Sequence, residues 1–143
     1  MIIQGNFIGD VPYFVVHIES SYFHGDVRFL ADTGASITTL LDRDYLLLRI
    51  PFTALEPLML PVVGIGGSVR SFTIKNVKFT FNSDNGPYII QQDLCIALHD
   101  LEKLPAPEAS RLMRLPSVLG RDILNRFNLS YNYKTGIIQL EDR

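Results

Sequence analysis

RFLADTGASITTL, residues 28–40, places one aspartate, Asp32, between two apolar runs. Burying a carboxylate beside such runs costs free energy unless hydrogen bonds or a partner charge hold it. Two interpretations follow. Either Asp-Thr-Gly closes an Asx-type turn at the end of a strand, with Gly34 supplying a positive φ, or Asp32 is half of a catalytic device whose other half lies elsewhere.

The length and composition predict a single domain, residues 1–143. The chain is 47% apolar, which is enough for a sizeable core, and its net charge is −2. No long basic run is present, so we expect no nucleic-acid partner. Gly, Asn, Asp and Pro interrupt the apolar residues of the segment 1–14, which is typical neither of a signal peptide nor of a membrane span, so we expect no membrane partner.

The single cysteine, Cys95, lies in the apolar run LCIAL, residues 94–98. No nucleophile motif surrounds it, which favours a small buried side chain over a reactive thiol. A chain with one cysteine forms no internal disulfide. This cysteine use is compatible with a reducing compartment, and we expect the cytoplasm.

Turn signals and short apolar runs predict mostly β-structure. The expected strands cover residues 1–8, 12–19, 24–32, 70–81, 88–98 and two segments within 129–142, around a turn at 134–136. Short helices are expected at 42–48 after a possible Asp42 cap, at 107–115 with Pro107 near the start, and at 121–127. Many short strands with little helix predict an all-β, barrel-like or sandwich-like domain.

Asp-Thr-Gly alone is a weak motif, but two further segments accompany it. LPVVGIGGSVRSF, residues 60–72, is rich in glycine, and LPSVLGRDIL, residues 115–124, places Gly120 and Arg121 before a short helix. In this order the three segments resemble the retroviral-type aspartic proteases, the retropepsins. The matching segments cover about half of the chain. The resemblance implies a retropepsin-like closed β-barrel with a flap hairpin and one or two short helices.

The resemblance implies an aspartic endopeptidase that needs no cofactor and no metal. In such enzymes two carboxylates share one proton, because two like charges so close together do not both ionise. Together they activate a water and protonate the leaving amine. Asp32 would be catalytic, Thr33 would lock the two loops together, and Gly34 would let the backbone approach. Asp93, Asp100 and Asp122 lack a following Thr/Ser-Gly, so the second carboxylate is expected from Asp32 of a second copy, in a homodimer.

The terminal strands of the family interleave to hold the dimer. Here residues 1–7 and 136–142 are apolar enough for that role, although the same strands could also close a monomer. Ala35 takes the place where pepsin-like relatives have Ser or Thr. The missing hydroxyl predicts activity at mildly acidic rather than strongly acidic pH.

By the same resemblance, the glycine-rich segment is the flap, residues 60–72, and it closes over an extended peptide or protein substrate. We expect apolar side chains on both sides of the scissile bond. The expected substrate-binding residues are Leu30, Ala35, Ser36, Ile37, Thr39, Val62, Gly64, Ile65, Gly66, Pro116 and Val118, and the expected structural residues are Gly120 and Arg121. Several of these side chains are equally compatible with a purely structural place in the core.

The sequence departs from the family in two places. Ser36 stands where the family commonly has an aspartate that pairs with the arginine, so Arg121 needs another carboxylate, for which Asp42, Asp44 or a terminal carboxylate are candidates. The chain is also longer than a retroviral protease between flap and Gly120. The excess, about residues 98–115, is either a solvated helix or a wall beside the substrate.

Two alternatives to the protease remain at this point. The same fold could serve as a dimerisation or peptide-binding module with little or no catalysis, because fold does not imply activity. An unrelated small β-barrel with a chance Asp-Thr-Gly is the other. His17, His24 and His99 are isolated in the sequence, which predicts no zinc site.

Overall fold

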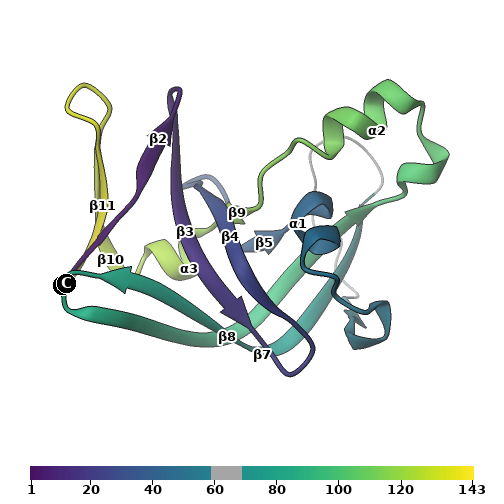
Figure 1. Cartoon of the computed structure of the whole chain (residues 1–143), viewed down its shortest axis with the longest axis horizontal. Coiled ribbons are helices and arrows are strands. Elements are labelled where there is room, and N and C mark those ends of the chain that lie inside the picture. The colour runs from purple at the N-terminus through teal and green to yellow at the C-terminus, as the bar shows by residue number, and fades with distance from the viewer. Residues whose placement is uncertain (59–68) are drawn as a thin grey trace.

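The computed structural model describes residues 1–58 and 69–143, and Figure 1 shows their arrangement. The strands are β1 (Ile2–Gln4), β2 (Asn6–Ile8), β3 (Val11–Glu19), β4 (His24–Ala31), β5 (Thr39–Leu40), β6 (Glu56–Pro57), β7 (Val69–Ser83), β8 (Gly86–His99), β9 (Val118–Leu119), β10 (Phe127–Asn132) and β11 (Ile137–Asp142). The helices are α1 (Asp42–Leu47), α2 (Ala106–Leu112) and α3 (Arg121–Leu124), with two 3₁₀ turns at Phe52–Ala54 and Leu101–Lys103.

Eight strands form the larger sheet, in the order β2-β3-β4-β9-β5-β8-β7-β6. An additional antiparallel pairing of β3 with β7 joins two strands that are distant in this order, so the strands from β3 to β7 close into a ring. Within the ring, β9 lies parallel to β4 and β5 lies parallel to β8. The predicted all-β class is confirmed.

The core fills the inside of the ring. Side chains alternate along β3, where Phe14, Val16 and Ile18 are buried and Val15 between them is exposed. This alternation is the period-2 signal of a strand with one buried face. Phe14 pairs across the strands with Phe29, and both are fully buried. Burial of such aromatic side chains contributes most of the stabilisation of a small domain.

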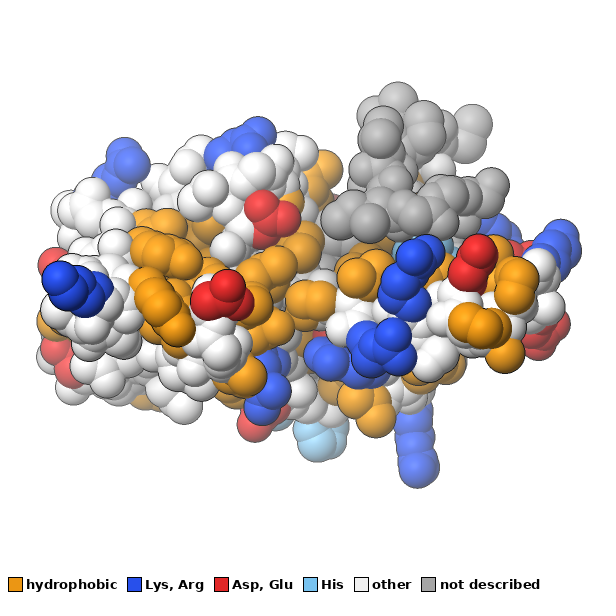
Figure 2. All heavy atoms as spheres, turned by 90° about the horizontal axis from the view of Figure 1, so that it is seen from above, with side chains coloured by type: hydrophobic (Ala, Val, Ile, Leu, Met, Phe, Trp, Pro, Cys, Tyr) orange, Lys and Arg blue, Asp and Glu red, His pale blue; other side chains and the backbone are white. Residues whose placement is uncertain are grey.

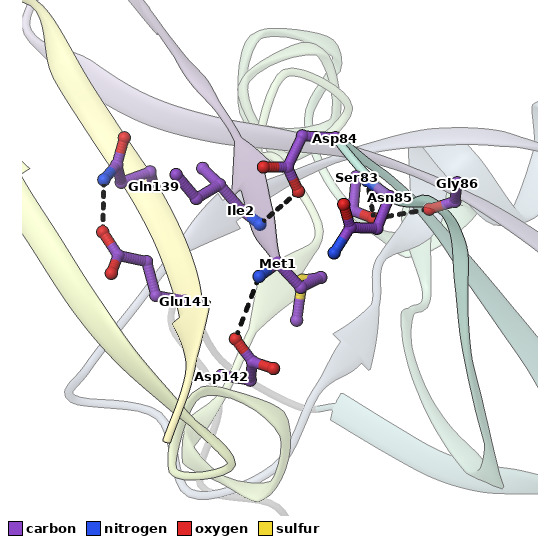
Figure 3. A network of polar contacts seen from close by, with 9 residues as sticks. All are labelled: Met1, Ile2, Ser83, Asp84, Asn85, Gly86, Gln139, Glu141 and Asp142. Carbon is purple, nitrogen blue, oxygen red and sulfur yellow. Dashed lines mark hydrogen bonds and ion pairs between the residues drawn. The ribbon is translucent and has the colours of Figure 1, made fainter.

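The two termini pair with each other inside one chain. β11 lies between β1 and β10 in a three-stranded antiparallel sheet. The backbone of Ile2 is tied to Asp84 in the β7–β8 turn, through Ile2 N–H to Oδ1 at 2.7 Å and Asp84 N–H to the Ile2 carbonyl at 3.0 Å. The Met1 ammonium group lies 3.2 Å from Oδ1 of Asp142 (Figure 3). Of the two arrangements open from the sequence, this chain therefore shows its terminal strands closing within the monomer.

The expected single strand over residues 1–8 is wrong, because Gly5 divides it into β1 and β2, which belong to different sheets. A side chain at Gly5 would overlap the Tyr13 carbonyl oxygen, since an added Cβ lies 2.4 Å from it. The backbone N–H of Gly5 instead bonds to the Ile138 carbonyl at 2.8 Å. The chain thus passes from one sheet to the other at Gly5, where only a residue without a side chain fits.

The three predicted helices are present, and each ends earlier in the chain than expected. The segment expected at 121–127 stops being helical after Leu124, and β10 begins at Phe127. The N-cap of α1 is Leu41, not Asp42. Asp42 is the first residue of the helix, and its carboxylate bonds elsewhere in the fold, as described below. None of the helices in the described part of the chain has the length and apolar content that crossing a membrane requires.

Candidate active site

Asp32 directly follows β4, and β9 fixes the end of that strand. Leu30 and Ala31 pair with Val118 and Leu119 in parallel register. The backbone N–H of Asp32 extends this ladder by one bond, to the Leu119 carbonyl at 3.0 Å. The position of Asp32 is therefore set by strand pairing between two segments that are separated by more than half of the chain.

The chain turns sharply after Asp32. Gly34 donates its N–H to Oδ1 of Asp32 at 2.9 Å, and Ala35 donates its N–H to the Asp32 carbonyl at 3.2 Å. This is the Asx-type turn that the sequence offered as one interpretation. The expected positive φ at Gly34 is wrong, since Gly34 is not among the glycines with positive φ. Glycine fits here for another reason, because an added Cβ would lie 3.1 Å from Oδ1 of Asp32.

In this turn one carboxylate oxygen of Asp32, Oδ1, accepts a hydrogen bond. Asp32 is half-buried, while Thr33 and Gly34 are exposed. Within residues 1–58 and 69–143, Oδ2 of Asp32 and the hydroxyl of Thr33 have no hydrogen-bond partner. In Figure 1, β4 runs upward to this turn, and Figure 2 views the molecule from that upper side, where hydrophobic side chains gather over the middle of the face.

The segment from Leu119 to Asp122 supports the turn from behind. Arg121 donates its backbone N–H to the Ala35 carbonyl at 2.8 Å, and Asp122 donates its own to the Ser36 carbonyl at 3.2 Å. Gly120 packs against the backbone of Ile37, where an added Cβ would lie 2.7 Å from the carbonyl carbon. The close approach of these two segments accounts for glycine at position 120.

Arg121 has a different partner from the one expected. Its side chain is not buried, and Nη1 donates to the Thr33 carbonyl at 2.8 Å. Asp42 and Asp44 bond to other residues, and no carboxylate pairs with Arg121 in the described part of the chain. The expectation of a carboxylate partner assumed a buried guanidinium, and exposure to water removes that requirement. Arg121 instead braces the backbone next to Asp32.

The other predicted substrate-binding residues fall into two groups. The described ones surround the turn: Leu30, Ala35, Pro116 and Val118 are half-buried, Ser36 and Ile37 are exposed, and Thr39 is buried. Thr39 lies in β5 and donates its hydroxyl to the Ile37 carbonyl at 3.0 Å. The expected flap residues Val62, Gly64, Ile65 and Gly66 lie outside the described residues.

Cys95 is buried in β8, opposite Thr39. Burial raises the pKa of the Cys95 thiol, the Thr39 hydrogen bond lowers it, and the negative charge of Asp122 raises it. The direction of the net shift keeps the thiol protonated and poorly nucleophilic. The prediction of a small buried side chain at this position is confirmed.

Sequence reasoning missed four carboxylate contacts around the site. Asp122 accepts bonds from Thr38 and Gln92, Asp42 holds His99, and Asp44 holds Ser117. The partners lie between 30 and 84 positions apart, so no local motif signals them. Among the described residues, no group of three or more His, Cys, Asp or Glu side chains has the geometry of a metal site.

The fold is similar to that of solved aspartic proteases. A retropepsin-like aspartic protease from Rickettsia conorii is similar with a TM-score of 0.56 and 20% identity, over 98% of this chain and 88% of that chain. EIAV protease, complexed with the inhibitor HBY-793, is similar with a TM-score of 0.48 and 21% identity, over 82% of this chain and 88% of that chain. No protein-family model matches the chain, and no curated protein matches its sequence. The Rickettsia likeness shows a retropepsin-like fold, as predicted, and at this identity it shows the fold alone.

Proposed function

We propose that this chain is an aspartic endopeptidase that works as a homodimer, with Asp32 of each copy at a shared site. The observation that supports this most directly is the Asp32 turn. It is braced by Leu119, Gly120, Arg121 and Asp122, in a retropepsin-like fold, and among the described residues one of its carboxylate oxygens has no donor. A turn that only closed a strand would not need this support on its far side.

The proposed chemistry needs two carboxylates and one water. The ionised carboxylate takes a proton from the water, whose oxygen attacks the peptide carbonyl carbon. The protonated carboxylate of the other copy donates its proton to the leaving nitrogen, and the C–N bond breaks. The products are a carboxylic acid and an amine, and the two aspartates again hold one proton between them. A single Asp32 cannot hold both roles at once, so a second copy is part of the proposal.

The upper face of the molecule, seen in Figure 2, is suited both to binding a substrate and to contact with a second copy. Leu30, Ile37, Pro116 and Val118, which are close to the turn in sequence or strand pairing, are exposed or half-buried and match substrates with apolar residues around the scissile bond. Hydrophobic side chains over the same face (Figure 2) also suit contact with a second copy. Since β1 pairs with β11 in the same chain, we propose that this face carries the dimer contact and that the terminal strands do not interleave with those of the partner.

The first test is peptide-library cleavage by the purified chain, from about pH 4 to 7, beside Asp32→Asn. We expect cleavage by the unaltered chain, strongest at mildly acidic pH, and none by Asp32→Asn. Asp26→Asn, an exposed carboxylate on β4, is the matched control and is expected to retain cleavage. Cleavage that persists in Asp32→Asn, or that is absent from both, contradicts the proposal and favours a peptide-binding module.

Mixing the two chains tests the dimer separately. If each site needs two Asp32 carboxylates, mixed dimers are inactive. A ninefold excess of Asp32→Asn then lowers the activity of a fixed amount of unaltered chain to about one tenth, once subunits exchange. Activity that does not change with the excess contradicts a shared site.

A free, buried Cys95 is compatible with the cytoplasm, which we keep as the proposed location.

A further inference from the structure

The chain between β8 and β9 is much longer than the fold requires. Cys95 of β8 and Val118 of β9 both lie opposite Thr39 of β5, on its two sides. Strands that flank one common strand are about 10 Å apart, twice the usual spacing. A connection of roughly four to six residues covers that distance. The segment from Asp100 to Pro116 is several times longer and includes α2.

The start of this segment is fixed to α1. His99, the last residue of β8, donates its backbone N–H to Oδ1 of Asp42 at 2.9 Å. Its ring Nδ1 lies 2.7 Å from Oδ2 of the same carboxylate, which can only accept. Both side chains are 4% exposed. One buried carboxylate thus holds both the backbone and the side chain of His99.

The end of the segment is fixed to the same helix at Asp44, two residues after Asp42. Ser117 donates its hydroxyl to Oδ2 of Asp44 at 2.6 Å, and it accepts the backbone N–H of Leu41 at 2.9 Å. Ser117 is fully buried and Asp44 is 6% exposed. Asp42 and Asp44 both lie in the first turn of α1. A six-residue helix therefore clamps both ends of the long connection.

The clamped segment rejoins the sheet directly beside the candidate site. The Ser117 carbonyl accepts the backbone N–H of Leu30 at 2.8 Å, and Leu30 precedes Asp32 by two residues. In Figure 1, α2 lies on the upper side of the molecule, the side toward which β4 carries the Asp32 turn. In α2, Leu112 is buried whereas Arg111 is exposed, so the helix has both an anchored and an open surface.

Burying two carboxylates costs free energy, which a loop without a role in the site would not require. Each must be matched by hydrogen bonds in the folded chain, and removing a partner from a buried carboxylate strongly destabilises its surroundings. A solvated loop needs neither anchor, because surface connections tolerate added length at little cost. The two buried anchors therefore indicate that the segment has to keep a fixed position.

We propose that residues 100–116 form a fixed wall beside the Asp32 turn, clamped by Asp42 and Asp44, and that this wall selects peptide residues flanking the scissile bond on the Val118 side. This inference rests on the proposed function. Asp42, Asp44, His99 and Ser117 are positioning residues in it, since they act through the segment that they hold. The residues that meet the substrate lie on the wall itself.

Two variants test the wall. In the first, a six-residue Gly/Ser linker replaces residues 101–115, which keeps His99 and Ser117. In the second, Asp42→Asn removes the charge that holds His99. Asp26→Asn is the matched control, because Asp26 and His17 form the same kind of pair, 2.8 Å apart, on the exposed surface of β3 and β4. Asp42→Asn carries the test alone if the shortened chain fails to fold.

The readouts separate selection from stability. The shortened chain is expected to cut a broader set of sites, with KM for long peptides raised about tenfold and kcat changed less than about twofold. Asp42→Asn is expected to change KM in the same direction and to speed amide hydrogen exchange in residues 100–116. Asp26→Asn should do neither. An unchanged set of cleavage sites, or a loss confined to kcat, overturns the wall.

A binding measurement separates this inference from the proposed function. Library peptides with apolar residues at their centre are titrated into Asp32→Asn, with and without the linker replacement, whether or not the unaltered chain cleaves them. Affinity that falls about tenfold with the linker supports the wall even where no cleavage occurs, and then only the protease proposal fails. Equal affinity in the two chains overturns the wall whether or not the unaltered chain cleaves.

Discussion

Thr38 donates two hydrogen bonds to a single oxygen of Asp122, from its backbone N–H at 3.0 Å and from its hydroxyl at 2.7 Å. The same oxygen accepts the N–H of Ile123 at 2.9 Å, and the other oxygen accepts the side-chain amide of Gln92 at 2.9 Å. One carboxylate thereby joins the end of the Asp32 turn, the start of α3 and the long strand β8.

Removing this carboxylate should loosen all three segments at once. Asp122→Ala removes an acceptor from four donors, of which only the Ile123 N–H keeps another, the Gly120 carbonyl at 3.2 Å, and we expect the free energy of unfolding to fall by about 2–4 kcal/mol. Cleavage should fall at least about tenfold, mainly in kcat, because the turn that carries Asp32 loses its support. Asp122→Asn keeps an oxygen for Thr38, and the amide of Gln92 can rotate to accept, so it should cost about 1 kcal/mol or less.

Urea unfolding and steady-state kinetics on both variants check this prediction. An alanine variant as stable and as active as the unaltered chain would show that the carboxylate contributes nothing to the turn. Equal losses in the two variants would instead point to the negative charge, not to hydrogen bonding.

A second prediction concerns Gly120. Gly120→Ala places a Cβ 2.7–2.9 Å from the backbone of Ile37, where the two segments cannot separate without breaking the bonds from Arg121 and Asp122 to the turn. We expect a loss of about 2–4 kcal/mol in the free energy of unfolding, together with most of the activity.

Gly136→Ala is the control for the glycine change. Gly136 has positive φ but nothing within 4 Å of an added Cβ, so only backbone strain acts there. We expect a cost of about 1–2 kcal/mol and unchanged kcat. Comparable kinetic losses from both substitutions would be evidence against close packing at Gly120 as the cause.

The sequence predicted the fold well where the signal was local. The β7–β8 hairpin was expected over 70–81 and 88–98 and extends over Val69–Ser83 and Gly86–His99. Period-2 alternation and the turn residues between the strands are enough for such an element. The short strands β5, β6 and β9 were not predicted, because two residues carry no period and owe their conformation to their neighbours.

The candidate site was predicted in part, for a related reason. A motif located Asp32, Gly34, Gly120 and Arg121, but their partners come from tertiary structure. Ser117 and Asp44 are 73 positions apart, and Asp42 and His99 are 57 apart. Asp42 was interpreted as a helix cap because a polar residue before an apolar run has that local meaning. Only the folded chain shows that its carboxylate faces β8.

The last prediction concerns the pH dependence of stability, through Cys95. Burial, the leading cause, raises the pKa of this thiol in the folded chain, whereas in the unfolded chain it titrates near its ordinary value of about 8.5. Below that pH both states hold the proton and the stability is complete. Above it the unfolded chain releases the proton first, so the free energy of unfolding falls as pH rises toward the folded pKa. The slope contributed by this one group is at most about 1.4 kcal/mol per pH unit.

Urea unfolding of the unaltered chain and of Cys95→Ala, at steps from about pH 7 to 9.5, measures this contribution. The alanine variant is expected to be less stable throughout, because it leaves a small cavity beside Thr39, but to lose less stability as pH rises. Burial also raises the pKa of Tyr45, whose effect begins only above about pH 10 and is common to both chains. Parallel pH profiles for the two chains would contradict the prediction, since they would mean that the thiol titrates alike in the folded and unfolded states.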